Sequence, residues 1–159
     1  MLFRSVTNGY FLNNELTDFS MAPEINGAPV ANRVEAGKRP LSSMSPTIVY
    51  GPDGVPIFTV GAAGGKRIIM QVAKTLIAHL DWGMSAQDAL AAPNIYFGGD
   101  AVLVEANTPL AAMQSQIAAL GRTVVTTDLM PAKANAAERT ANGWRGAADP
   151  RSDGVALKE

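Results

Sequence analysis

The chain has 159 residues, of which 47% are hydrophobic and 17% are charged, and its formal net charge is -1. This is the composition of a globular domain that can bury a core, and its near-neutral charge provides no attraction for nucleic acid or an anionic membrane. The lack of cysteine and the single histidine exclude a disulfide scaffold, a thiol nucleophile and a metal site built on cysteines or on several histidines.

The first residues contain no secretory signal, because residues 1–5 lack an apolar core and a small-residue cleavage site. No apolar run in the chain reaches the roughly 18 residues of a membrane span. We expect residues 1–8 to be a non-native or disordered start, residues 9–159 to form one domain, and the natural protein to extend further upstream.

Residues 12–20 are polar, with apolar anchors at positions 12, 16 and 19, and this spacing predicts one helical turn or a tight loop. Glu15 and Asp18 lie three positions apart, so their carboxylates could share one side of the turn and receive an ammonium group. The alternative is a solvated loop that caps itself. Residues 21–38 contain prolines and glycines without periodicity, which predicts a surface loop.

Residues 38–46 predict a proline-bounded turn with adjacent hydroxyls at Ser42 and Ser43. These hydroxyls could donate hydrogen bonds to a carboxylate, although serines before proline are also ordinary turn residues. Residues 47–60 predict a β-hairpin that turns at residues 51–54. Such a hairpin would bring the serine turn close to the glycine-rich turn of residues 61–67.

Gly64 and Gly65 lie directly before a helical pattern. The N–H groups at the N-terminus of a helix suit a carboxylate or a developing oxyanion. The alternative is a plain turn that needs positive φ. The pattern argues against a phosphate loop, because its spacing is one residue short and Arg67 stands where a serine or threonine is required.

Helical periodicity then continues to about residue 82. Gly83 is expected to cap this helix, and Ser85 should start a second, short helix that ends near Pro93. His79 lies near the apolar stripe and, without a second histidine, is expected to be structural. The apolar stripe consists of Ile68, Ile69, Val72, Leu76 and Leu80.

The remaining chain predicts short strands at residues 94–97, 101–105 and 123–127 and a hairpin that turns at residues 142–143. A helix begins at Thr108, with Pro109 in its first position. The fold class is α+β with antiparallel strands. The expected buried face of the helix consists of Leu110, Met113, Ile117 and Leu120.

Three blocks, in this order, resemble the small subunit of γ-glutamyltranspeptidase. They are LNNELTDFS at residues 12–20, KRPLSSMSPT at residues 38–47 and GAAGGKRII at residues 61–69. GAADPRS at residues 146–152 resembles the closing motif of the same family. The resemblance runs from about Gly9 over essentially the whole chain.

The resemblance implies an N-terminal nucleophile hydrolase with a four-layer αββα fold, made as a zymogen that cuts itself into a large and a small subunit. The new N-terminal threonine of the small subunit would attack the γ-glutamyl amide of glutathione, with its α-amine as base. The acyl-enzyme would pass the γ-glutamyl group to water or to an amino acid or peptide. We expect this chain to be an incomplete sandwich that lacks the nucleophile strand and the large subunit and is inactive alone.

By resemblance, Glu15 and Asp18 would bind the α-ammonium group of the substrate, and Ser42 and Ser43 would bind its α-carboxylate. The implied partners are glutathione or other γ-glutamyl compounds and the large subunit of the same precursor, which would add an arginine. No cofactor or metal is implied. A periplasmic or secreted location is expected from the family.

Also by resemblance, the backbone N–H groups of Gly64 and Gly65 would form the oxyanion hole. Two parts of the matched blocks depart from the family pattern. Ala62 and Ala63 stand where the family usually has Ser-Pro, which keeps the N–H donors but could alter the turn. Thr17 stands where an acidic residue is typical.

Two alternatives remain beside a γ-glutamyltransferase. One is a related amidase of the same superfamily that acts on a β-lactam side chain or on poly-γ-glutamate. The presence of Glu15 and Asp18 argues against it, because a glutaryl-type acyl group has no ammonium to bind. The other is a non-catalytic module that binds γ-glutamyl compounds or amino acids.

Overall fold

The computed structural model describes residues 6–128 and 133–157, and the chain divides into two compact units, Met1–Ser42 and Ser43–Glu159. The predicted non-native or disordered start at residues 1–8 falls mostly on residues 1–5, which lie outside the described residues. The predicted single domain over residues 9–159 stays a prediction. Each unit is described below by itself.

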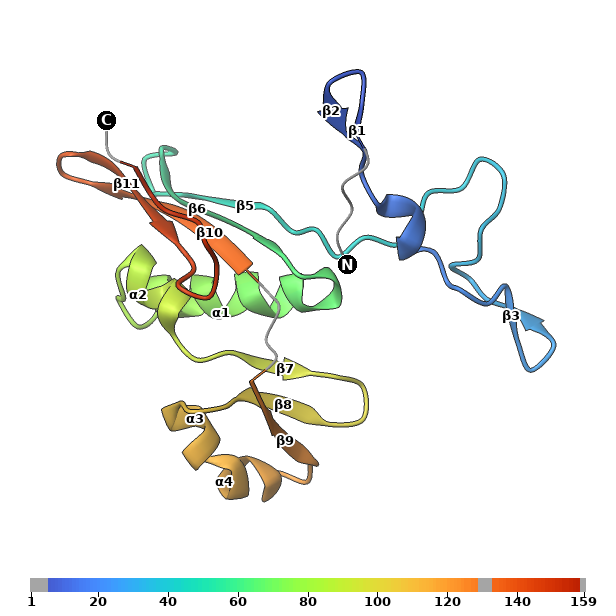
Figure 1. Cartoon of the computed structure of the whole chain (residues 1–159). Helices are drawn as coiled ribbons and strands as arrows, with labels where there is room; N and C mark the ends of the chain where they lie inside the picture. Colours follow the sequence, from blue (N-terminus) through green and yellow to red (C-terminus); the bar gives the residue numbers. More distant parts are fainter. Residues whose placement is uncertain (1–5, 129–132, 158–159) are drawn as a thin grey trace. The chain divides into compact units, whose positions relative to one another are not determined.

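In its described residues, the first unit contains short elements joined by turns (Figure 1), and several of these turns are closed by backbone hydrogen bonds. Residues 12–20 contain a single 3₁₀ turn, which confirms the predicted helical turn. In the predicted surface loop, a small hairpin turns at Asn26 and Gly27, whose φ angles of 52° and 76° suit a tight turn. The elements are β1 (Val6–Thr7), β2 (Tyr10–Phe11), η1 (Glu15–Asp18), β3 (Glu24–Ile25) and β4 (Ala28–Pro29).

The second unit is built on a four-stranded antiparallel sheet in the order β11-β10-β6-β5. The predicted hairpins are both present, because β5 pairs with β6 and β10 pairs with β11. The central pairing of β6 with β10 joins the two hairpins. The strands are β5 (Thr47–Tyr50), β6 (Pro56–Ala63), β10 (Lys133–Thr140) and β11 (Gly143–Ala148).

Two helices cover one face of this sheet, as Figure 1 shows for α1 (Ile68–Leu80) and α2 (Ala86–Ala91). A 3₁₀ turn, η2 (Gly65–Arg67), leads into α1. Strand alternation directs every second residue of β6 and β10 towards the helices, so Ala136 of β10 lies beside Val60 of β6 on the buried face. The buried core consists of Phe58, Val60, Ile68, Val72, Ala86, Leu90, Ala134, Ala136 and Ala147.

The predicted apolar stripe of α1 is only partly correct. Ile69 and Leu80 are 54% and 48% exposed, whereas the polar Gln71 and Thr75 are buried. The reason is rotational: residues 68, 71, 72 and 75 share one face, and Ile69 lies about 100° away from Ile68. The helix ends as predicted near Gly83, which has a φ of 66°.

A smaller three-stranded sheet corrects the prediction of purely antiparallel strands. β7 (Ile95–Phe97) pairs antiparallel with β8 (Val102–Glu105), but β9 (Val124–Thr127) pairs with β8 in parallel. Parallel neighbours need a crossover, and here two short helices provide it. The fold class α+β is otherwise confirmed.

The predicted helix after Thr108 is broken. It consists of α3 (Pro109–Ala112) and α4 (Gln114–Ala118), separated at Met113, whose φ and ψ are -90° and 7°. The break changes the helical phase, so Met113 and Leu120 are 45% and 81% exposed instead of buried as predicted. The predicted cap is confirmed, because Thr108 accepts a hydrogen bond from the N–H of Ala111.

Candidate functional site

The turn at Gly64 and Gly65 is a backbone arrangement that depends on glycine. Their φ angles are 150° and 58°, and both lie in the region that residues with a side chain rarely adopt. The first N–H groups of a helix have no partner within it. Among the described residues, neither of these two N–H groups has a hydrogen-bond acceptor. The turn therefore presents two backbone donors at the start of η2, beside the positive end of the helix dipole.

In the second unit, the β5–β6 hairpin has residues 43–46 and residues 61–64 at the same end. Thr47 pairs with Val60, so the chain that enters from Ser43 and the chain that leaves towards Gly64 share one end of the hairpin. Ser43 itself is half-buried. Next to this end, residues 61–63 line a pocket of about 480 Å³ together with Lys133, Asn135, Ser152 and Gly154.

Glu15 and Asp18 occupy the first and last positions of η1, and both are exposed. In a 3₁₀ helix, residues i and i+3 lie on the same side, so the two carboxylates project from one face of the turn as predicted. Local hydrogen bonds within residues 13–17 stabilise the turn. Asn13 accepts a hydrogen bond from the N–H of Glu15 at 3.1 Å, and the carbonyl of Asn14 accepts one from Thr17.

Asn32 was not identified from the sequence, although it links two predicted site segments. Its Nδ2 donates to the carbonyl of Asp18 at 2.7 Å, and its Oδ1 accepts from the N–H of Leu41 at 2.9 Å. Leu41 immediately precedes Ser42. Within the first unit, Asn32 therefore connects the acidic turn to the start of the serine pair. An asparagine in a loop offers no local pattern that would predict this role.

The predicted site residues are divided between the two units. The first unit contains Glu15, Asp18 and Ser42, and the second contains Ser43, Gly64 and Gly65. In the first unit, hydrogen bonds of the Asn32 side chain join the carbonyl of Asp18 to the N–H of Leu41, which precedes Ser42.

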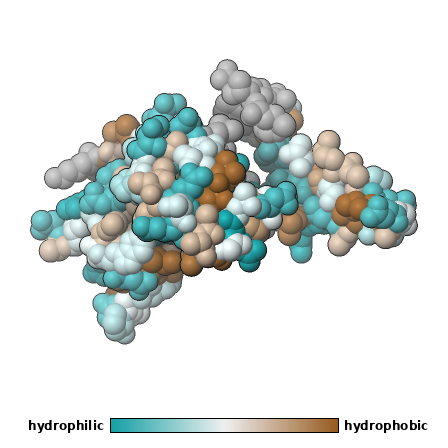
Figure 2. All heavy atoms as spheres, turned by 90° about the horizontal axis from the view of Figure 1, so that it is seen from below, coloured by the Kyte–Doolittle hydropathy of each residue, from teal (hydrophilic) through white to brown (hydrophobic). Residues whose placement is uncertain are grey.

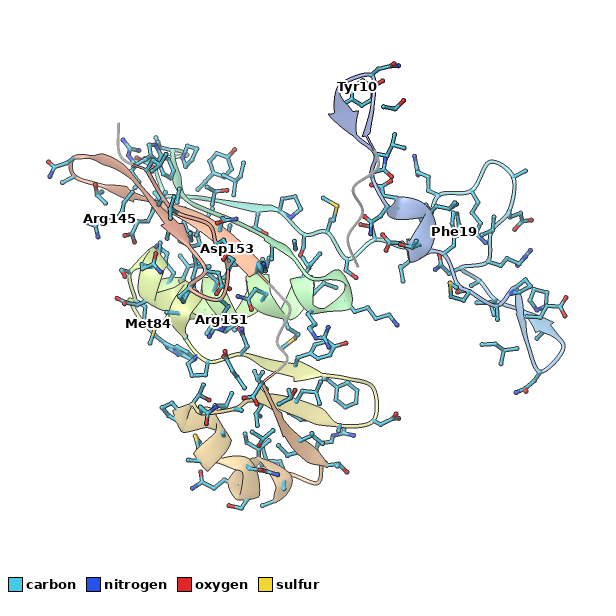
Figure 3. The ribbon with its side chains drawn as sticks, in the orientation of Figure 1. Tyr10, Phe19, Met84, Arg145, Arg151 and Asp153 are labelled. Carbon is cyan, nitrogen blue, oxygen red and sulfur yellow. The ribbon has the colours of Figure 1, made fainter. Side chains whose placement is uncertain are left out.

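Arg151 of the closing motif, labelled in Figure 3, belongs to a buried polar network in the second unit. The Arg151 guanidinium contacts Glu105 at 2.5 and 2.8 Å and Asp149 at 3.0 Å. It also donates to the carbonyls of residues 90, 91 and 92, which end α2. Asp149 is fully buried and accepts a further hydrogen bond from Gln71 of α1. The network therefore joins α1, α2, β8 and the end of β11.

Hydrogen bonds in this network overcome the effect of burial on two of its charges. Burial would raise the pKa of Glu105, but the hydrogen bonds from Arg151 and the Asn94 N–H lower it below its ordinary value. Burial would likewise lower the pKa of Arg151, but the carboxylates of Glu105 and Asp149 raise it. Both groups are therefore charged at neutral pH, as a stable ion pair requires.

The same environment disfavours the protonated form of Lys74. Its Nζ donates to the carbonyls of Leu90 and Ala92 at 3.1 and 2.8 Å. Burial and the nearby charge of Arg151 lower the pKa of Lys74 from 10.5 to about 8, although Asp149 and Glu105 act in the opposite direction. A neutral amine still has two N–H donors for the two carbonyls.

We therefore expect the free energy of unfolding to increase with pH between about 8 and 10.5 through Lys74. The unfolded chain keeps this proton up to the higher value, whereas the folded chain loses it at the lower one, so raising the pH favours the folded state. Urea unfolding of the full-length protein at several pH values measures this slope. A Lys74→Met variant should have a flatter profile, and equal slopes for the two proteins would contradict the assignment.

His79 has the structural position that the sequence analysis expected. Its ring stacks on Phe58 with 4.1 Å between centroids, and its Nδ1 lies 2.8 Å from the carbonyl oxygen of Met84. No group of three or more potential metal ligands occurs among the described residues. None of the helices in the described ranges is long and apolar enough to cross a membrane.

Comparisons with known proteins agree with the resemblance seen in the sequence. The γ-glutamyltranspeptidase family model matches residues 3–158. The glutathione hydrolase proenzyme of Pseudomonas aeruginosa is 33% identical over 158 residues, which cover 94% of this chain and 28% of that protein. The glutathione hydrolase proenzyme of Bacillus subtilis is 48% identical over 88 residues, which cover 55% of this chain and 14% of that protein.

Solved structures give the same result for the fold. A mutant of the γ-glutamyltranspeptidase of Helicobacter pylori matches with a TM-score of 0.75 and 34% identity, over 91% of this chain and 83% of that chain. The predicted N-terminal nucleophile hydrolase fold is confirmed in the part that this chain contains, one sheet with helices on one face. The chain spans less than a third of the length of the two proenzymes, at 28% and 14%.

Proposed function

The chain belongs to the γ-glutamyltranspeptidase family, and we propose that the protein of which it forms part is a γ-glutamyltransferase and glutathione hydrolase. This protein cleaves γ-glutamyl amides through a threonine acyl-enzyme and passes the γ-glutamyl group to water or to an amino acid. The observation that best supports the proposal is the pair of N–H donors at Gly64 and Gly65, which have no acceptor among the described residues.

These donors suit the step in which negative charge develops. When a nucleophile attacks the γ-glutamyl carbonyl, its oxygen becomes an oxyanion, and fixed N–H groups stabilise it more than they stabilise the substrate carbonyl. Gly64 and Gly65 provide two such groups on a turn with positive φ angles at both residues. The threonine nucleophile and its α-amine base come from a part of the protein outside this chain.

Recognition of the γ-glutamyl group needs complementary charge at both ends of the amino acid. Glu15 and Asp18 provide two carboxylates on one side of η1 for the α-ammonium. Ser42 and Ser43 provide adjacent hydroxyls that donate to the α-carboxylate, together with an arginine of the large subunit. An acyl group without the ammonium would leave the two carboxylates unpaired, which gives a preference for γ-glutamyl over glutaryl amides.

The exposed apolar surface supports a large-subunit partner from the same precursor. Figure 2 shows hydrophobic patches among polar ones. Leu16 and Met21 of the first unit are 73% and 95% exposed, and Trp82 and Leu120 of the second are 63% and 81% exposed. Large exposed apolar side chains are candidates for burial in an interface with another protein surface. We assign this role to the large subunit.

The recognition role predicts a change in KM when one carboxylate is neutralised. In the full-length processed protein, Glu15→Gln should raise KM for L-γ-glutamyl-p-nitroanilide by about 10- to 100-fold, because a hydrogen bond to a charged group contributes about 1.5–3 kcal/mol. The chromogenic release of p-nitroaniline measures this change.

Glu35→Gln is the matched control. Glu35 is an exposed carboxylate of the same unit that pairs with Arg33 at 3.0 Å and with Lys38 at 3.7 Å. It lies outside the proposed site, so its neutralisation should leave KM within about twofold, as for an exposed ion pair. Unchanged kinetics in Glu15→Gln would instead favour the related amidase.

A further inference from the structure

We propose that Asn32 is a positioning residue that sets the separation between the ammonium-binding and carboxylate-binding parts of the γ-glutamyl site. The inference rests on the proposed function. It comes from the two hydrogen bonds of one side chain, which join backbone groups of Asp18 and Leu41. Both hydrogen bonds lie within the first unit.

The amide of Asn32 is matched at both ends. Its Nδ2 is a donor and meets the carbonyl of Asp18 at 2.7 Å, whereas its Oδ1 is an acceptor and meets the N–H of Leu41 at 2.9 Å. A side-chain amide is the group that carries an N–H donor and a carbonyl acceptor on the same carbon atom. Aspartate has the same length as asparagine but would lack the N–H donor for the carbonyl of Asp18.

Backbone bonds fix Asn32 itself against the same turn. The carbonyl of Asn32 accepts a hydrogen bond from the N–H of Ser20 at 2.8 Å, two residues after Asp18. On the other side, Lys38 Nζ donates to the carbonyl of Ala31. Two side chains therefore tie the segment before Ser42 to residues 31 and 32, and residue 32 is tied twice to the end of η1.

This geometry matters because the substrate offers two charged groups on one carbon atom. The α-ammonium and α-carboxylate of a γ-glutamyl group cannot move apart, so the protein groups that bind them must be held at a fixed separation. Glu15 and Asp18 are on a one-turn helix and Ser42 is in an extended loop, and neither element is rigid by itself. The Asn32 amide is the side-chain link between the two.

The test compares two substrates in the full-length processed protein. L-γ-glutamyl-p-nitroanilide has both the α-ammonium and the α-carboxylate. Glutaryl-p-nitroanilide has the corresponding carboxylate but lacks the ammonium group. The quantity is the ratio of kcat/KM for the two substrates in one preparation. This ratio does not depend on how much of the enzyme is folded, so a loss of stability alone leaves it unchanged.

We expect Asn32→Ala and Asn32→Asp to lower this ratio by tenfold or more, mainly through KM for the γ-glutamyl substrate. Asn26→Gly is the control, because Asn26 is an exposed asparagine of the same unit with a φ of 52° that glycine adopts freely. It should keep the wild-type ratio. An unchanged ratio in both Asn32 variants overturns the inference but leaves the proposed function intact. A wild-type protein that does not turn over the γ-glutamyl substrate, or does not prefer it, overturns both.

Discussion

Replacement of Gly64 by alanine in the full-length protein is expected to lower kcat for L-γ-glutamyl-p-nitroanilide by about 100- to 1,000-fold, the usual cost of losing one oxyanion donor. The reason is conformational, because the φ of Gly64 is 150° and its ψ is 20°. A residue with a Cβ must leave this region, and the N–H groups at Gly64 and Gly65 then turn away from the oxyanion. KM should change little, since the oxyanion forms only in the transition state.

Gly61→Ala provides the matched control for this prediction. Gly61 lies three residues earlier in β6, does not have a positive φ, and has nothing within 4 Å of an added Cβ. It should keep kcat within about threefold, because neither its backbone conformation nor its packing has to change. Equal kcat values for the Gly61 and Gly64 variants would show that the glycine turn does not provide the oxyanion hole.

Replacement of Arg151 by methionine is expected to lower the free energy of unfolding by about 3–5 kcal/mol, the usual cost of breaking a buried ion pair from one side. Methionine fills much of the space but leaves Asp149, which is fully buried, and Glu105 without their cation. The carbonyls at the end of α2 lose their donors as well. Urea unfolding of the full-length protein measures the difference.

Arg145→Met separates this effect from a general loss of an arginine. Arg145 pairs with Glu138 at 3.3 Å, but its side chain is 64% exposed. Glu138 also keeps the hydrogen bond from the N–H of Ala86 at 3.0 Å. The expected loss is at most about 1 kcal/mol, as for a surface ion pair. Similar losses for the two variants would mean that the network around Arg151 contributes no more than surface pairs do.

Elements defined by local chemistry could be predicted from the sequence. Ser85 starts α2 by accepting the N–H of Asp88, as the spacing of the two residues indicated. A β-rich segment at residues 47–50 and a strong turn signal at residues 51–54 predicted the first hairpin, and Thr47 does pair with Val60. The glycine turn could also be predicted, because two adjacent glycines before a helical pattern indicate a turn with positive φ angles.

Features that depend on distant partners could not be predicted in the same way. The parallel pairing of β8 with β9 requires knowledge of how α3 and α4 return the chain. Arg151 meets Glu105 across 46 positions and the carbonyls of α2 across about 60. For Arg151, the only signal in the sequence is the family resemblance of the closing motif. Asn32 had no local signal, because its role is visible only through the two backbone groups that it joins.

The most direct test of the account is the rate at which the full-length processed protein hydrolyses L-γ-glutamyl-p-nitroanilide relative to glutaryl-p-nitroanilide. If Glu15 and Asp18 bind the α-ammonium, kcat/KM should be about 10- to 100-fold or more higher for the γ-glutamyl substrate than for the glutaryl substrate. Equal kcat/KM values for the two substrates, or turnover of the glutaryl substrate alone, would contradict the proposed γ-glutamyl site.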